Sequence, residues 1–216
     1  MDESNLFRTT RDFFEKCLYP IAQPGDASLV QAAVLIPLIE KSGTPHLIFT
    51  RRSMTVATHK GQISFPGGMV EPGDVNTRET ALREAKEEIG LEPCNVQIAG
   101  YLDGLKTVTD FWITPVVGIV LSSFAYVIQE AEVAEVFEVP LPDLRCLDNW
   151  ESGTRKYRGV AYQDRRFRCG KHVIWGATGK ITYALMEKLN GVDSRCGQDK
   201  TKLSPDGCAP PPHSHQ

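Results

Sequence analysis

The sequence predicts a single α/β domain in which a mixed β-sheet is sandwiched between helices. Short apolar runs typical of strands are interleaved with a few helical patterns along the chain. Such mixing within one domain favours a sheet covered by helices. The length of 216 residues suits one domain with a sizeable core, so we expect one folded unit rather than two.

The composition is that of an ordinary soluble globular protein, with 41% hydrophobic and 24% charged residues. A net charge of −3 gives no electrostatic argument for nucleic acid or an anionic membrane as the main partner. No apolar run approaches the ~18 residues of a membrane span. The acidic start lacks the apolar segment of a secretory signal, so we expect a cytoplasmic protein.

The cysteines are scattered and form no Cys-x-x-Cys pair. We therefore expect reduced thiols rather than a zinc site or a disulfide framework. The residues concerned are Cys17, Cys94, Cys146, Cys169, Cys196 and Cys208.

The first part of the chain predicts a helix followed by a hairpin. An amphipathic helix is expected over residues 5–18, with a loop up to residue 26. The apolar run 31–39 predicts a buried strand, and a Ser-Gly turn leads from it into a second strand over 46–51. A short strand over 63–65 follows.

The remaining strands are expected in the second part of the chain, before a final helix over 180–189. Beyond Gly191 the chain becomes polar and rich in proline, which is typical of a disordered tail. The strands are predicted over residues 96–102, 111–121, 136–139 and 173–175.

An acidic helix with clear start and stop signals lies in the middle of the chain. Asn76 is a good N-cap, and Glu79 three residues later makes a capping-box-like pair. Gly90 suits the left-handed position that ends a helix. Its apolar stripe is expected to face the core and consists of Ala81, Leu82, Ala85 and Ile89.

Three glutamates of this helix, Glu84, Glu87 and Glu88, lie on neighbouring positions of one face, which we expect to face solvent. Two like charges about 4 Å apart repel by roughly 4 kcal/mol at an effective dielectric near 20. Oxygen ligands alone indicate a hard divalent cation, with Mg²⁺ the first choice and Mn²⁺ the second. The alternative is a solvated face with partners such as Arg83.

The segment from the Gly67-Gly68 turn to Leu91 resembles the Nudix box. Every fixed position of the second half of the box matches, from Arg83 onward. The first half departs, because Asp74 stands where the box has glutamate and one extra residue precedes Arg83. The chain is thus identified as a member of the Nudix hydrolase superfamily. The resemblance implies an α/β/α sandwich in which the box forms a loop, a helix and a loop.

The resemblance also implies the site and its chemistry. Glu84, Glu87 and Glu88 are expected to be catalytic and to hold the metal ion, with the carbonyl of Gly67 as a further ligand. Arg83 is expected to hold a box carboxylate in place. The implied reaction is hydrolysis of a diphosphate that joins a nucleoside to another group, by attack of water at phosphorus.

The general base for this water cannot be chosen from the box alone. Three acids outside it are candidates: Glu130, Glu132 and Glu135. Each of them is as easily a surface acid on a loop. A water activated by the metal and a box glutamate, with no further base, is also open.

The segment before the box is similar to the additional motif of the coenzyme A diphosphatase branch of the superfamily. The extra residue in the box is usual in this branch, whereas Ala57 stands where the motif has arginine. The resemblance runs from about Ala32 to Leu189. We therefore divide the chain into an N-terminal helix and loop (1–28), a Nudix hydrolase domain (29–190) and a C-terminal tail (191–216). The motif residues in register are Thr50, Arg52, Ser53, Gly61, Phe65, Pro66, Gly67 and Gly68.

This branch implies a substrate of the coenzyme A class, cut into 3′,5′-ADP and a 4′-phosphopantetheine product. Arg52, Ser53 and Gly61 are expected at the substrate, and Arg52 and His59 could supply positive charge for phosphate. One alternative is a diphosphatase for ADP-ribose, dinucleotides or nucleoside triphosphates. Another is a nucleotide sensor that binds without cleaving. The oligomeric state is left open.

Overall fold

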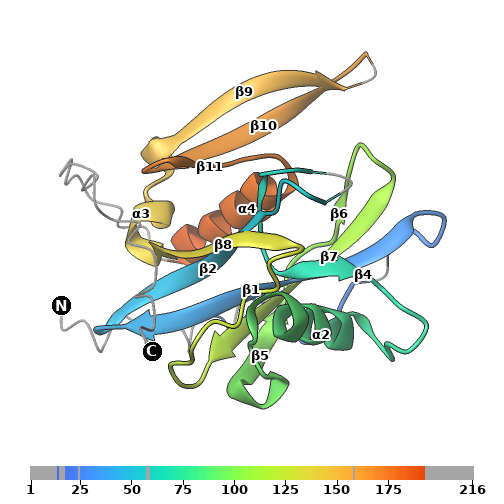
Figure 1. Ribbon diagram of the computed structural model, residues 1–216. Helices are drawn as coiled ribbons and strands as arrows, with labels where there is room; N and C mark the ends of the chain where they lie inside the picture. Colours follow the sequence, from blue (N-terminus) through green and yellow to red (C-terminus); the bar gives the residue numbers. More distant parts are fainter. Residues whose placement is uncertain (1–13, 15–17, 24, 57–58, 158, 193–216) are drawn as a thin grey trace.

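The structure of the chain, a computed structural model, describes residues 14, 18–23, 25–56, 59–157 and 159–192. An eight-stranded mixed sheet forms its centre. Helix α2 (Thr77–Ile89) covers one face of this sheet and helix α4 (Gly176–Val192) the other (Figure 1). This arrangement confirms the predicted α/β class with a mixed sheet between helices.

The central sheet is mostly antiparallel, and its parallel pair is formed by the first and seventh strands. All strands predicted in this region are present, within a few residues of the expected bounds. The sheet consists of β1 (Val30–Lys41), β2 (Thr44–Arg52), β3 (Ile63–Ser64), β4 (Gly67–Met69), β5 (Val96–Tyr101), β6 (Leu105–Lys106), β7 (Phe111–Val120) and β8 (Val133–Pro140).

The two strands of the β1–β2 hairpin separate away from their turn, and the glycine turn pairs with β1 where they have separated. The two-residue turn of the hairpin has positive φ at Ser42 and Gly43 (51° and 82°), as a tight hairpin requires. β1 pairs with β2 only near this turn, and further along it pairs with β4 instead. Gly67 and Gly68 are therefore held against β1, beside Val34 and Ala33.

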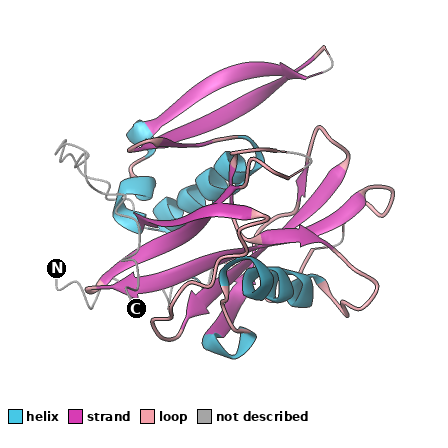
Figure 2. Ribbon diagram, in the orientation of Figure 1, coloured by secondary structure: helices cyan, strands magenta, loops and turns pink. Residues whose placement is uncertain are grey.

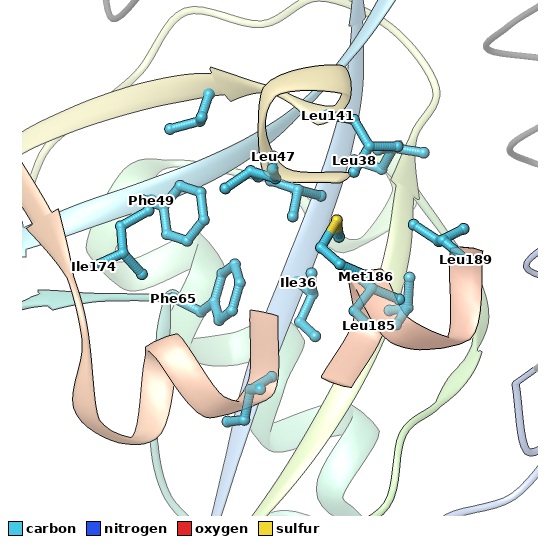
Figure 3. Close-up of a cluster of buried hydrophobic side chains, with 14 of the residues drawn as sticks. Ile36, Leu38, Leu47, Phe49, Phe65, Leu141, Ile174, Leu185, Met186 and Leu189 are labelled. Atoms are coloured by element: carbon cyan, nitrogen blue, oxygen red, sulfur yellow. The ribbon is translucent and has the colours of Figure 1, made fainter. Parts of the chain in front are cut away.

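Two apolar cores lie on opposite faces of the central sheet. On the α4 side, the rings of Phe49 and Phe65 are stacked with their centroids 4.7 Å apart (Figure 3). Phe137 stacks on Phe49 as well, with a centroid distance of 5.7 Å. On the α2 side, Leu35 and Ile48 pack with the apolar stripe of the acidic helix. Alternation along the strands assigns each side chain to one core.

A second, antiparallel sheet stands beside α4 and was not predicted in full. It consists of β9 (Trp150–Tyr157), β10 (Val160–Cys169) and β11 (His172–Ile174), of which only the last was expected (Figure 2). The short helix α3 (Leu141–Arg145) was also missed, and α4 is longer than expected.

Other predictions of the sequence have mixed outcomes. The expected N-terminal helix falls largely, and the C-terminal tail almost wholly, outside the described residues. Cys94 and Cys146 are free, but Cys169 is disulfide-bonded, so the expectation that all thiols are reduced is wrong for that residue. Within the described ranges, no helix is long and apolar enough to span a membrane.

Candidate active site

Helix α2 begins and ends where the sequence predicts. The side chain of Asn76 accepts the backbone N–H of Glu79 at 3.1 Å, and the carboxylate of Glu79 accepts the N–H of Val75 at 3.0 Å. Gly90 adopts the left-handed conformation, with φ of 73°, and donates its N–H to the carbonyl of Lys86. The capping prediction is confirmed.

The three glutamates of α2 do not all face solvent, and for Glu88 that expectation is wrong. Glu88 is only 2% exposed, Glu84 is partly buried, and Glu87 is exposed. The loop 121–132 explains the difference, because it covers the end of the helix. Backbone N–H groups of Val127 and Gln129 donate to the carbonyls of Ile89 and Glu88 at 3.1 Å and 3.0 Å.

Arg83 connects the helix to the glycine turn. Its guanidinium donates to Glu84 at 2.9 Å and to Glu87 at 3.1 Å. It also donates to the carbonyl of Met69 at 3.2 Å and to both carboxylate oxygens of Asp74 at 3.1 Å. A planar fork of donors suits such a network. Arg83 therefore fixes two helix carboxylates relative to the turn.

Asp74, which replaces the glutamate of the box, is saturated with donors. Besides Arg83, it accepts the hydroxyl of Thr80 and the backbone N–H of Glu71, both at 2.9 Å. The hydrogen bonds from Arg83 above all hold the pKa of Asp74 well below its usual range. Asp74 thus closes the turn that leads into α2.

The glycines of the turn are required by close approach. A Cβ on Gly68 would lie 2.3 Å from a carboxylate oxygen of Glu84, and one on Gly67 would lie 2.4 Å from the carbonyl oxygen of Ala33. Real Cβ atoms do not come so close to oxygen. The missing side chains therefore let Glu84 rest on the backbone of β4.

Glu88 has few of the partners that a buried carboxylate needs, although a backbone hydrogen bond from Gly67 is among them. Its Oε2 has no hydrogen-bond partner in the described part of the chain, and its Oε1 lies 3.9 Å from Nη1 of Arg52. Burial first, and then the charge of Glu84, raise the pKa of Glu88 to about 8. The Nε of Arg52 is also buried without a partner. The site is therefore short of positive charge and of donors.

Of the three acids considered as the general base, Glu132 is the one whose charge acts on the box glutamates. The charge of Glu132 contributes to the raised pKa of both Glu84 and Glu88. The carbonyl of Glu132 accepts the N–H of Ser53 at 2.7 Å, which ties its loop to the end of β2. Its own side chain is exposed.

Glu135 is engaged on the other face of the sheet. It pairs with Arg51 at 3.0 Å, with Lys171 at 2.9 Å and with His172 at 3.3 Å. Glu130 is exposed on the loop before β8. These two acids are therefore placed less well than Glu132 to act at the box.

The predicted substrate residues cluster at the loop between β2 and β3. Ser53 is buried and its hydroxyl bonds to that of Thr55 at 2.7 Å, while Gly61 has a positive φ of 67° and donates its N–H to the carbonyl of Arg52. These contacts give the loop its shape. His59 is exposed and bonds through Nδ1 to Gln62. Ala57 lies outside the described residues.

The donor set of the site fits a hard cation, although the structure does not assemble a full ligand shell. Among the described residues, no three His, Cys, Asp or Glu side chains are placed to hold a metal ion together. The charge of Glu84 acts on Glu88, whereas Glu87 is exposed and, like Glu84, pairs with Arg83. The unpartnered Oε2 of Glu88 is the kind of oxygen that Mg²⁺ or Mn²⁺ accepts.

Comparison with known proteins agrees with this geometry. The family model for the NUDIX domain matches residues 29–156. An uncharacterized Nudix hydrolase NudL of Photorhabdus laumondii is 37% identical over 158 residues, which cover 73% of this chain and 84% of that protein. The NudL of Citrobacter koseri, also an uncharacterized Nudix hydrolase, is 36% identical over 183 residues, covering 84% and 94%.

Solved structures match the chain at low sequence identity. The MutT protein from Methanosarcina mazei Go1 superposes with a TM-score of 0.49 at 18% identity, over 77% of this chain and 99% of that one. The domain match and the identity to the NudL proteins, by contrast, are extensive enough to establish the family. The chain belongs to the Nudix hydrolases, enzymes that act on phosphoanhydride bonds.

Proposed function

We propose that this enzyme hydrolyses the diphosphate of coenzyme A or its thioesters, with Mg²⁺ or Mn²⁺ as cofactor. The catalytic part of the proposal rests on the buried carboxylate of Glu88. Its Oε2 is unpartnered, and the charge of Glu84 acts on it. A buried carboxylate with one oxygen left without a donor is costly, and the like charge of Glu84 adds to that cost. A divalent cation offsets both, and Nudix enzymes generally use such ions.

The cation would be held by Glu84 and Glu88, with the carbonyl of Gly67 as the further ligand that the box implies. Glu87, which now pairs with Arg83, completes the expected set. When bound, a divalent ion polarises a phosphoryl oxygen, neutralises diphosphate charge and lowers the pKa of water. Carboxylates and a backbone carbonyl are the ligand types that suit this ion.

The residues around the cation have separate tasks. Arg83 positions Glu84 and joins it to Asp74, so that the carboxylate stays on the backbone of Gly68. Glu132 is the proposed general base, because it is the outside acid that interacts with both buried glutamates. Its loop is fixed at both ends, by Ser53 and by the end of α2.

Coenzyme A is proposed as substrate because the branch motif is in register from Thr50 to Gly68 apart from Ala57. Two motif residues support this proposal, because Ser53 and Gly61 shape the loop that adjoins the box. Arg52, the charged residue of the motif, lies against Glu88 and so at the edge of the proposed metal site. A phosphate could be bound there by its guanidinium.

A substrate panel tests the proposal. The full-length protein with Mg²⁺ is given coenzyme A, ADP-ribose and a dinucleotide at equal concentration, and products are identified by mass. We expect 3′,5′-ADP and 4′-phosphopantetheine from coenzyme A as the fastest reaction. A large preference for ADP-ribose would reject coenzyme A as the substrate but would leave the proposed diphosphatase activity standing. Binding without any product rejects catalysis and favours a sensor.

A further inference from the structure

A buried aspartate holds two arginines on the second sheet, away from the Nudix box. Asp164 of β10 is fully buried. Its Oδ2 lies 3.0 Å from Nε of Arg155 and 2.9 Å from Nε of Arg166, and its Oδ1 accepts the N–H of Gly176 at 3.2 Å. One carboxylate thus faces two guanidinium groups. A positive charge is left over, because the other nearby acid, Glu151 opposite Arg166, pairs with Arg168.

The outer ends of the two guanidinium groups remain available. Asp164 engages each arginine through Nε, and the side chains of Arg155 and Arg166 are 37% and 31% exposed. Within the ranges that the structure describes, no hydrogen bond uses their terminal Nη nitrogens. The guanidinium of Arg155 also lies over the ring of Trp175, 4.3 Å from its centroid, which limits its rotation. Both groups are oriented before any ligand arrives.

Open space adjoins this pair. Gly153 is the residue directly opposite Asp164 in the β9–β10 register, and a Cβ built on it would meet no atom within 4 Å. Opposed residues of an antiparallel pair present their side chains on the same face, so the gap lies on the face of the arginines. A Cβ built on Gly176, whose N–H donates to Asp164, would also meet no atom within 4 Å. An anion can therefore reach the Nη nitrogens.

The pair also lies on the side of the molecule that carries the substrate loop. Trp175 and Gly176 lead into α4, and the hydroxyl of Thr178 in its first turn donates to the carbonyl of Ile63 at 3.1 Å. Ile63 begins β3, directly after the loop between β2 and β3. Figure 1 shows the β9–β10 hairpin standing over this end of α4.

We propose that Arg155 and Arg166 form a phosphomonoester subsite that receives the 3′-phosphate of the coenzyme A substrate. The inference rests on the proposed function. Two oriented guanidinium groups suit a phosphate dianion, because each presents a fork of donors. The subsite would bind this phosphate in a chain whose motif has Ala57 in place of the arginine.

Coenzyme A and 3′-dephospho-coenzyme A, which differ only in that phosphate, test the subsite. We expect the wild-type protein to prefer coenzyme A in kcat/KM. Arg155→Gln and Arg166→Gln each lower kcat/KM for coenzyme A by about tenfold to a hundredfold, the value of one charge-assisted hydrogen bond. Both variants leave kcat/KM for 3′-dephospho-coenzyme A unchanged. Arg165→Gln is the matched control, because Arg165 lies over the ring of Tyr183, on the other face of β10.

Three results would overturn the subsite: equal losses on both substrates, no loss on either, or the same selective loss in Arg165→Gln. Wild-type binding of 3′,5′-ADP against AMP, measured by calorimetry, needs no variant to fold and no turnover. Preference for 3′,5′-ADP supports the subsite, and equal affinity rejects it. If the protein cleaves ADP-ribose but not coenzyme A, the proposed function fails, and this binding measurement still decides the subsite separately.

Discussion

Asp74 and Glu88 are both buried carboxylates of the box region, yet their surroundings are opposite. Their side chains are 7% and 3% exposed. Asp74 accepts hydrogen bonds from Arg83, Thr80 and a backbone N–H, and its pKa is held well below the usual range. Glu88 has one unpartnered oxygen and a pKa raised to about 8. A carboxylate whose oxygens all accept hydrogen bonds stabilises the fold, whereas one with an unpartnered oxygen can bind a cation.

The same contrast separates the two ends of α2. At its start, caps and Arg83 satisfy every acid that the structure buries. Towards its end, the helix and the loop 121–132 enclose Glu88 with only the distant Arg52 as counter-charge. Strongly perturbed groups of this kind cluster at functional sites. The burial of Glu88 destabilises the fold, and we attribute it to a role of this carboxylate in metal binding.

The largest expected effect is that of Glu88→Gln on turnover. The amide keeps the shape of the side chain but is a poor ligand for a hard cation, so the metal-dependent rate should fall by about a hundredfold to a thousandfold. Turnover at saturating Mg²⁺ measures this, with Glu79→Gln at the helix cap as the control. An unchanged rate would reject Glu88 as a ligand.

The second effect concerns the pH dependence of stability without metal. The unfolded chain loses the Glu88 proton near its ordinary pKa of 4.5, whereas the folded protein keeps it until about pH 8. The raised pKa therefore stabilises the fold fully below pH 4.5, and this contribution is lost as pH rises to 8. The loss is on the order of 4 kcal/mol.

Denaturant unfolding in chelator at pH 5 and pH 8 measures this loss. Glu88→Gln carries no titrating group, so its free energy of unfolding should fall less between the two pH values. At pH 8 the variant should be more stable than wild type, since no charge is buried. Parallel pH dependence of the two proteins would show that Glu88 is not the group responsible.

Asp74→Ala should destabilise the fold, whereas Glu88→Gln should stabilise it at pH 8. It removes the partner of Arg83 and two further hydrogen bonds, and we expect a loss of about 2–3 kcal/mol in the free energy of unfolding. Glu71→Ala is the control, because Glu71 is exposed and lies 3.8 Å from Arg83. Thermal or denaturant unfolding compares them. Equal stability of the two variants would remove the contrast with Glu88.

The glycines of the turn offer a matched pair with a smaller effect. Gly68→Ala places a methyl group 2.3 Å from Glu84, whereas Gly73→Ala meets no atom within 4 Å. The first should lower turnover by about tenfold or more through displacement of Glu84, and the second should leave stability within about 0.5 kcal/mol. Kinetics and unfolding of both variants are the measurement. Equal effects would mean that the contact at Gly68 is dispensable.

The smallest effect is expected from Arg52→Gln in the absence of substrate. Arg52 is the counter-charge of Glu88, so it competes with a cation for that carboxylate. Its removal should tighten Mn²⁺ binding by about twofold to fivefold, the range of a partly exposed ion pair. A titration followed by electron paramagnetic resonance detects this. Weaker binding would show that Arg52 supports the metal rather than opposing it.

The sequence predicts the helix of the site because its signals are local. Asn76, Glu79 and Gly90 fix the ends of α2 through contacts with near neighbours. The burial of Glu88 is not local, since it depends on a loop some forty residues later in the chain. Helical periodicity places Glu88 only near the edge of the apolar stripe, and the loop then decides its exposure.

The second sheet was missed for a related reason. β9 and β10 carry charged and polar residues on both faces. Among their side chains that the structure describes, the buried ones are few: Trp150, Asp164, Phe167 and Cys169. Asp164 is buried by two arginines and by the start of α4, and these partners are brought together only by the fold. Strand patterns based on apolar alternation cannot detect such a ribbon.

Direct titration of the purified protein with Mn²⁺ decides whether the box glutamates hold a metal ion. The wild-type protein should bind the ion at a site that Glu84→Gln and Glu88→Gln each weaken strongly, and hydrolysis should stop in excess chelator. Equal Mn²⁺ affinity in both variants, together with cleavage that persists in chelator, would contradict the account.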